Sequence, residues 1–170
     1  MKIAITDACI FIDLIELQLS SQFFFLKIEI HTTLDVFNEL YPEQQEVLRA
    51  YQSTGKLLIH NLSPMDRLEL KNTAFPRSLS DVDKSVILIA QRNNAMILSS
   101  DKAVRNFAKA SAIEYHGMLW IFDMLIDHEL IRKSEAILKI NNLVENNIVY
   151  RNNMELISEI KNRIEKWNLL

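Results

Sequence analysis

The 170-residue sequence has few of the residues that interrupt regular structure, with only two glycines and three prolines. So few breakers leave little material for long flexible linkers. No glycine-rich segment resembles a phosphate-binding loop, which argues against a nucleotide-binding fold. The single cysteine, Cys9, cannot form an intramolecular disulfide. We therefore expect a cytoplasmic protein in which Cys9 is a small buried hydrophobe.

Long apolar runs are also absent. No stretch approaches the roughly 20 residues that a membrane-spanning helix needs, so we expect no membrane partner. The N-terminus carries an acid, Asp7, inside its first apolar run and does not resemble a secretory signal. With 49% hydrophobic residues the chain can bury a sizeable core. Its net charge of −3 is unlike the basic balance of a typical nucleic-acid binder.

The apolar residues alternate between strand-like and helix-like spacing. Strands are predicted at residues 2–6, 27–30, 57–60, 95–98 and 113–116, with helices between them and after the last. Short apolar strands that alternate with helices are typical of a parallel sheet covered on both faces. We predict a three-layer α/β/α sandwich with a central, mostly parallel sheet over residues 1–130. Residues 131–170 are predicted to form a helical C-terminal extension of two amphipathic stretches with Asn-rich interruptions, packed on this domain or on a partner.

Four acids lie at or near the expected strand ends. Asp7 ends the first strand, Asp101 follows the fourth, Asp83 lies in the first turn of a helix, and Glu39 lies on the helix after the second strand. Ligands of an open α/β sheet bind beyond the carboxyl ends of its strands, so these side chains can converge there. Clustered carboxylates raise one another's pKa values or are neutralised by a cation, and oxygen ligands favour Mg²⁺ or Mn²⁺. This predicts metal-assisted hydrolysis of a phosphodiester.

Each acid also has a purely structural interpretation. Asp7 and Asp101 can each cap a helix, and Asp83 lies where the helix dipole favours a negative charge. Glu39 can be an ordinary surface residue, and Asp35 and Asp81 are read as dipole-stabilising or solvated acids. The joint placement of the four acids, rather than any one of them, carries the metal-site hypothesis.

These motifs resemble the PIN-domain family over about residues 1–130. The segments that carry the resemblance are Ile3-Ala4-Ile5-Thr6-Asp7-Ala8, Val36-Phe37-Asn38-Glu39-Leu40, Leu79-Ser80-Asp81-Val82-Asp83 followed by Ala90, Met96-Ile97-Leu98-Ser99-Ser100-Asp101, and Gly117-Met118-Leu119-Trp120. Two features depart from the family pattern. Ala8 stands where the family usually has Ser or Thr, and the helical tail after Ser134 lies beyond the minimal domain.

The resemblance implies that Asp7, Glu39, Asp83 and Asp101 bind Mg²⁺ or Mn²⁺, with Ser99 orienting Asp101 or a metal-bound water. It implies a metal-dependent endoribonuclease, a hydrolase of the VapC-like branch that supplies the toxin of toxin–antitoxin pairs. The resemblance also implies that RNA is the substrate, that an antitoxin protein is a partner and that the chain forms a homodimer. Basic residues beside the last two acids are candidates for RNA contacts: Arg77, Lys102 and Arg105.

Three other functions compete with this interpretation. A phosphoacceptor receiver domain would need a second acid after the first strand and a Lys after the last, where this chain has Thr6 and His116-Gly117. An Asp-x-Asp phosphatase would need a second acid at Cys9. A non-catalytic PIN-fold binding scaffold remains open, although all four acids are present.

Overall fold

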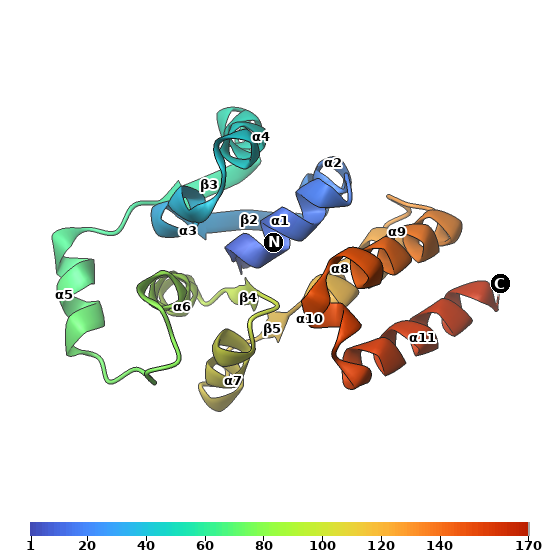
Figure 1. The fold of residues 1–170 in the computed structure, drawn as a ribbon. Coiled ribbons are helices and arrows are strands. Elements are labelled where there is room, and N and C mark those ends of the chain that lie inside the picture. Colours follow the sequence, from blue (N-terminus) through green and yellow to red (C-terminus); the bar gives the residue numbers. More distant parts are fainter. Residues whose placement is uncertain (170) are drawn as a thin grey trace.

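The computed structural model describes residues 1–169 and has a five-stranded sheet at its centre. Its strands are β1 (Lys2–Thr6), β2 (Ile28–Thr33), β3 (Leu57–His60), β4 (Met96–Leu98) and β5 (Tyr115–His116). They are ordered β3-β2-β1-β4-β5, and every neighbouring pair is parallel. The chain is therefore an α/β protein with the predicted parallel sheet (Figure 1).

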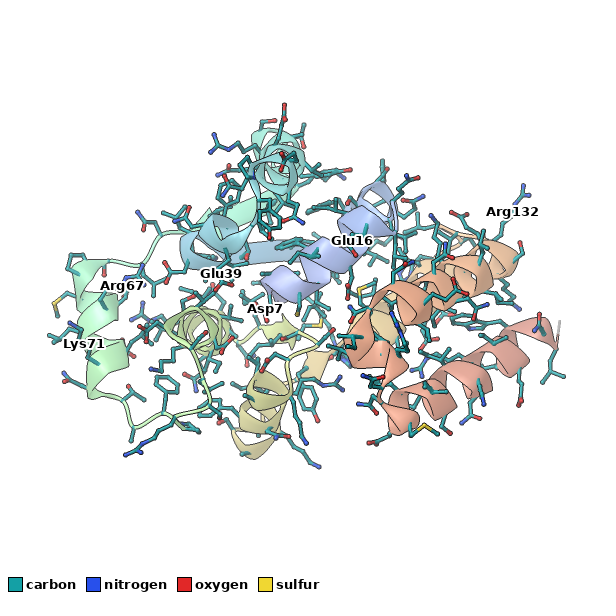
Figure 2. All side chains as sticks on the ribbon, in the orientation of Figure 1. Asp7, Glu16, Glu39, Arg67, Lys71 and Arg132 are labelled. Carbon is teal, nitrogen blue, oxygen red and sulfur yellow. The ribbon has the colours of Figure 1, made fainter. Side chains whose placement is uncertain are left out.

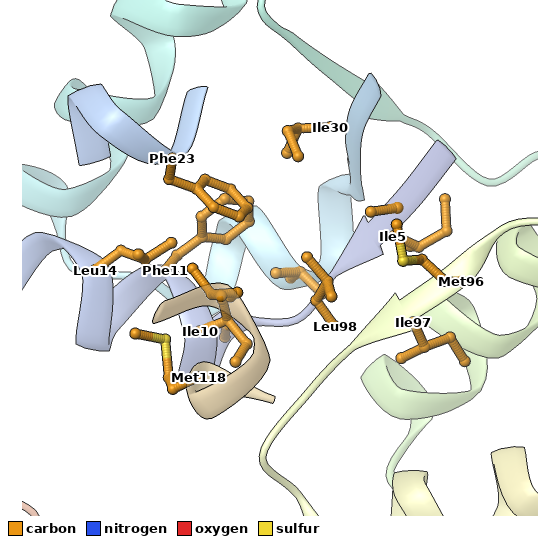
Figure 3. Close-up of a cluster of buried hydrophobic side chains, with 14 of the residues drawn as sticks. Ile5, Ile10, Phe11, Leu14, Phe23, Ile30, Met96, Ile97, Leu98 and Met118 are labelled. Carbon is orange, nitrogen blue, oxygen red and sulfur yellow. The ribbon is translucent and has the colours of Figure 1, made fainter. Parts of the chain in front are cut away.

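Helices pack on both faces of this sheet (Figure 1). Up to the last strand they are α1 (Ala8–Glu16), α2 (Ser20–Phe24), α3 (Leu34–Glu39), α4 (Pro42–Ser53), α5 (Pro64–Asn72), α6 (Asp81–Asn93) and α7 (Lys102–Ala110). α6 lies against β1, β2 and β4. Figure 3 shows Phe11 of α1, Phe23 of α2 and Met118 gathered with sheet residues such as Leu98. Burying each such side chain contributes about 1.5–3 kcal/mol.

Side-chain caps start several helices where the sequence predicts them. The Thr33 hydroxyl accepts from the Val36 amide at 3.2 Å, and Ser63 and Ser80 each begin a reciprocal capping box. Each cap satisfies amides at a helix N-terminus that would otherwise lack partners. Gly55 ends α4 with a φ of 72°, a left-handed conformation that glycine adopts without strain. Capping therefore sets the positions of the helices that carry two of the acids.

The structure around the second strand differs from what the sequence pattern predicts. The aromatic and aliphatic run over 22–30 begins inside helix α2, and β2 begins at Ile28 and extends to Thr33. The Phe24 ring stacks on Phe11 at 6.5 Å and on Tyr51 at 3.9 Å between centroids. These contacts join residues that are distant in sequence, so local periodicity does not reveal them. Packing therefore sets the local structure here.

The last strand is shorter than expected. We predicted it over 113–116, and the structure has only Tyr115–His116 paired with β4. Ala112 has a φ of 55°, which turns the chain out of α7 immediately before this segment. Glu114 still accepts the Ile97 amide at 2.9 Å, so the approach to the strand is hydrogen-bonded to the sheet.

The tail forms the predicted helical extension, with α8 (Met118–Asp127) leading into α9 (Lys133–Asn146), α10 (Ile148–Arg151) and α11 (Met154–Asn168). The prediction of two helical stretches was wrong, because Asn147 and Asn153 act as N-caps that start α10 and α11. Asn141–Asn142 does not interrupt α9, since Ile140 and Leu143 on either side are buried. Leu170, the end of the predicted extension, lies outside the described residues.

The extension packs on the same chain. Lys139 Nζ donates to the Leu17 carbonyl at 2.6 Å, and Arg163 pairs with Asp123 of α8 at 3.0 Å. In Figure 1 the helices α9 to α11, in orange and red, lie at one end of the molecule, and α5 lies at the other. No helix among residues 1–169 is both long and apolar enough to cross a membrane.

Candidate functional site

The four acids singled out in the sequence line one cleft of about 1070 Å³. Asp7 follows β1 and Asp101 follows β4, and these two strands are neighbours in the sheet. Glu39 comes from the end of α3 and Asp83 from the first turn of α6. Figure 2 shows Asp7 and Glu39 near the centre of the molecule. The fold thus brings residues from four separate segments to one edge of the sheet.

Asp7 is the most buried of these acids, with 6% of its surface exposed. Its Oδ1 accepts the Ala8 amide at 2.7 Å, so it caps α1, and its Oδ2 accepts the Ser99 hydroxyl at 2.8 Å. Burial raises the pKa of this carboxyl, and the negative charge of Asp83 raises it further against the opposing hydrogen bonds. Asp7 is therefore both a helix cap and a carboxylate whose charge is poorly compensated.

Glu39 and Asp83 share this electrostatic environment. The pKa of Glu39 is raised by partial desolvation first, and then by the charges of Asp7 and Asp83. Asp83 Oδ2 accepts the Ser80 amide at 2.7 Å in the capping box of α6. The structural and the functional interpretation of Asp83 are thus compatible. The negative charge of Asp83 thus contributes to the raised pKa values of both Asp7 and Glu39, so the three acids lie close to one another.

Asp101 occupies the other side of the cleft. Its Oδ1 accepts the Val104 amide at 3.0 Å and caps α7. The Ser99 hydroxyl accepts the Asp101 backbone amide at 3.1 Å while donating to Asp7. Ser99 therefore links two of the acid-bearing segments directly. The Ser99 hydroxyl contacts the carboxylate of Asp7, whereas at Asp101 it contacts only the backbone amide.

The chemistry of the donors fits a hard divalent cation. All four side chains offer carboxylate oxygens, the ligands that Mg²⁺ and Mn²⁺ prefer. Within residues 1–169, however, no three His, Cys, Asp or Glu side chains are grouped so that they could hold a metal ion together. Mg²⁺ usually retains several waters and binds through one or two carboxylates. A water-rich site with few direct protein ligands agrees with both observations.

Several cleft residues escape sequence reasoning. Asp13 of α1 is 3% exposed, its pKa is raised by burial to about 6, and it accepts the Asn147 amide group at 3.1 Å. Tyr150 of α10 is 3% exposed, and its hydroxyl is 3.0 Å from that of Ser100. The local sequence gives one indication of these contacts, which is that Asp13 lies among apolar neighbours in α1. Asn147 is 134 positions from Asp13 and Tyr150 is 50 positions from Ser100, so sequence spacing does not indicate these contacts.

Cys9 also lines the cleft instead of being a simple core residue. It is half-buried, its Sγ accepts the Ser100 amide at 3.3 Å, and it lies 3.6 Å from Asp7 Oδ2. Burial, together with the charge of Asp7, raises the pKa of the thiol to about 12. The thiol therefore stays protonated and can donate weakly to Asp7.

The candidate RNA contacts divide into two groups. Lys102 and Arg105 of α7 line the cleft beside Asp101. The Arg105 guanidinium lies 5.4 Å from the centre of the Tyr115 ring, a cation–π contact that holds it at the cleft wall. Arg77 is exposed in the connection between α5 and α6 and is not among the residues that line the cleft.

A search of curated proteins gives no match. Two solved structures are similar: a PilT N-terminus domain protein from the archaeon Sulfolobus solfataricus P2, and a domain of a functionally unknown protein from Methanocaldococcus jannaschii DSM 2661. The first has 15% identity and a TM-score of 0.48, over 74% of this chain and 92% of its own. The second has 20% identity and a TM-score of 0.46, over 69% and 91%.

A family comparison is more specific. The family DUF3368, described as a PIN domain, matches residues 3–166 and thus includes most of the C-terminal extension. PIN domains are generally nucleases and typically use divalent metals. This match covers far more than half of the chain, and the chain therefore belongs to the PIN-domain family.

Proposed function

We propose that this protein is a Mg²⁺- or Mn²⁺-dependent endoribonuclease. The observation that carries the proposal is the shared cleft, in which Asp7, Glu39, Asp83 and Asp101 meet from four segments of a PIN domain. A bound divalent cation would activate a water and stabilise the leaving oxygen of a phosphodiester. One or two of the four carboxylates would bind that cation directly and the others through water, and Ser99 would keep the Asp7 carboxylate oriented toward it.

The positive wall of the cleft supports a nucleic-acid substrate. Lys102, Arg105 and Lys109 are separated by three or four residues on α7, so they share one face of that helix. Cations there can contact phosphates while the acids opposite hold the metal. This local separation of charge is how a chain with a net charge of −3 would bind RNA.

The direct test is cleavage of a panel of structured and single-stranded RNAs by the purified chain, with Mg²⁺, Mn²⁺ or EDTA. We expect cutting with either metal and none in EDTA. Calorimetry with Mn²⁺ accompanies the assay. Metal binding without cutting would mean that the panel lacks the substrate, whereas a folded chain that neither binds metal nor cuts RNA is the non-catalytic PIN-fold scaffold.

Arg105 provides a sharper test of the RNA-binding wall. Arg105→Gln should reduce the dependence of log affinity on log salt concentration by about 1, because one phosphate contact is lost. Arg77→Gln is the matched control, since Arg77 is exposed outside the cleft and should leave that slope unchanged. Fluorescence anisotropy with a labelled RNA in Ca²⁺ or with an inactive variant measures the slope. Equal effects of the two variants would contradict the assignment.

The finer biological role is proposed on the same basis. We assign the chain to the VapC-like toxin branch, with an antitoxin protein as partner, a cytoplasmic location and a homodimer as its form. Exposed apolar side chains on the tail, including Leu138 and Ile148, support pairing through the extension. Light scattering of the full chain measures its mass, and a strict monomer would contradict the dimer.

A further inference from the structure

Two histidines face each other on neighbouring strands, away from the acidic cleft. His31 lies on β2 and His60 ends β3, the edge strand of the sheet. Because Thr33 pairs with His60 in parallel register, His31 and His60 lie diagonally on the same sheet face. His31 Nδ1 and His60 Nε2 are 3.1 Å apart, with the ring planes at 50°. Neither residue lines the cleft, so the proposed nuclease chemistry does not involve them.

The separation of the two nitrogens is that of two ligands on one metal ion. Metal–nitrogen bonds to histidine are about 2.0–2.1 Å long. Two such bonds place their nitrogens roughly 2.9 Å apart at a right angle and roughly 3.3 Å apart in a tetrahedron. The observed 3.1 Å lies between these values. An ion can therefore replace the shared hydrogen bond without separating the two nitrogens, provided that the rings tilt so that both lone pairs point at the ion.

The surroundings favour the ligand form of both rings. Glu29 Oε2 lies 3.6 Å from His31 Nε2, a position that favours a proton on this nitrogen and leaves Nδ1 as an acceptor. A carboxylate behind a histidine is the usual partner that orients a metal ligand. Burial lowers the pKa of both His31 and His60, so the rings are neutral at neutral pH.

We propose that His31 and His60 form a second metal site, which takes a nitrogen-preferring transition-metal ion such as Zn²⁺, Ni²⁺ or Cu²⁺. Glu29 positions His31, and water completes the coordination, since no third His, Cys, Asp or Glu joins a metal-binding group within the described chain. To bind, neutral His60 moves its proton from Nε2 to Nδ1, so no proton is released. His60 is only half-buried on the sheet edge, which gives the ion a route from solvent.

The ion would tie the edge strand β3 to β2. An ion that binds the folded chain but not the unfolded chain raises the stability of the folded state by mass action. A bound ion should raise the thermal midpoint by about 5 °C at a hundredfold excess over the dissociation constant. The acidic cleft offers oxygen ligands and should therefore suit Mg²⁺ or Mn²⁺. Compared with the His31–His60 pair, it should favour Zn²⁺, Ni²⁺ or Cu²⁺ less strongly.

The test uses the full chain carrying Asp7→Asn, so that metal binding by the acidic cleft is weakened. Calorimetry with Ni²⁺ or Zn²⁺ should show one equivalent bound, and His60→Gln in this background should remove it. Gln can still hydrogen-bond to His31 but is a poor ligand for these ions. His128→Gln, at the exposed histidine that ends α8, is the matched control and should leave binding unchanged. Glu29→Gln should weaken binding about tenfold or more.

A spectroscopic measurement on the chain with native histidines removes any dependence on how the variants fold. Pulsed electron paramagnetic resonance of one equivalent of Cu²⁺ should detect two imidazole nitrogens. A signal from one imidazole or none would overturn the proposal, as would binding that survives His60→Gln. Because the readouts are stoichiometry and nitrogen coupling, they are independent of RNA cleavage. Failure of the proposed nuclease would therefore leave this site standing, and the reverse also holds.

Discussion

Asp7→Asn is expected to lower metal-dependent RNA cleavage by about 10³-fold or more, because a neutral amide replaces the most buried of the four clustered acids. The variant keeps the local architecture. Its carbonyl oxygen can still accept the Ala8 amide, and Asn is as good an N-cap as Asp. Its amide group can donate to Ser99, which then serves as an acceptor. The loss of activity would therefore report on charge and not on the position of α1.

The same substitution should stabilise the metal-free protein at neutral pH. The pKa of Asp7 is raised in the folded state, mainly by burial, above its ordinary value of 3.8. A carboxyl with a raised folded pKa contributes fully to stability below the unfolded pKa, and this contribution is lost as pH rises through the folded value. Asn does not titrate. The thermal midpoint of the variant in EDTA should therefore exceed that of the wild type at pH 7, and the difference should shrink toward pH 4.

Asp81→Asn is the matched control for both measurements. Asp81 lies two residues from Asp83 on α6, but its side chain is 92% exposed and it does not line the cleft. We expect its cleavage rate and its stability to stay within experimental error of the wild type. If Asp7→Asn cleaves RNA as fast as the wild type, or if both variants lose activity equally, the proposed site is wrong.

The acids were predictable from sequence because topology alone places them. In a parallel sheet the carboxyl ends of the strands share one edge, so Asp7 and Asp101 must lie near each other once β1 and β4 are recognised. Asp83 follows from the Ser80 capping signal, which fixes the start of α6. These inferences need only local patterns and one topological rule, and for this reason the fold and the convergence of the acids could be anticipated.

The opposite wall of the cleft was not predictable in this way. Tyr150 reaches Ser100 from α10, and Asn147 reaches Asp13 from the end of α9. Such contacts depend on how the tail docks, and periodicity says only that the tail is helical. The role of Cys9 is similar, because Ser99 and Ser100 become its neighbours only when β1 and β4 lie side by side. Long-range packing thus determines the part of the site that local patterns leave open.

Tyr150→Ala is expected to lower the free energy of unfolding by about 3–5 kcal/mol, the cost of deleting a large buried aromatic side chain. Tyr150 is 3% exposed, and its hydroxyl is 3.0 Å from Ser100 Oγ. Its loss would leave a cavity between α10 and the loop after β4, with the Ser100 hydroxyl and the Asp13 carboxylate short of a partner. Both groups are largely enclosed, which adds to the destabilisation.

Urea unfolding at equilibrium measures this loss, and two further variants divide it into parts. Tyr150→Phe keeps the ring and removes the hydroxyl, so it should cost about 1–2 kcal/mol. Val149→Ala changes the adjacent residue of α10, which is 54% exposed, and should shift the free energy by no more than about 0.5 kcal/mol. If the tail were only loosely attached to the rest of the PIN domain, Tyr150→Ala would cost less than about 1 kcal/mol. A loss in the expected range would instead mean that α10 is integral to the fold, so that the wall facing the four acids is as firmly held as the sheet that bears them.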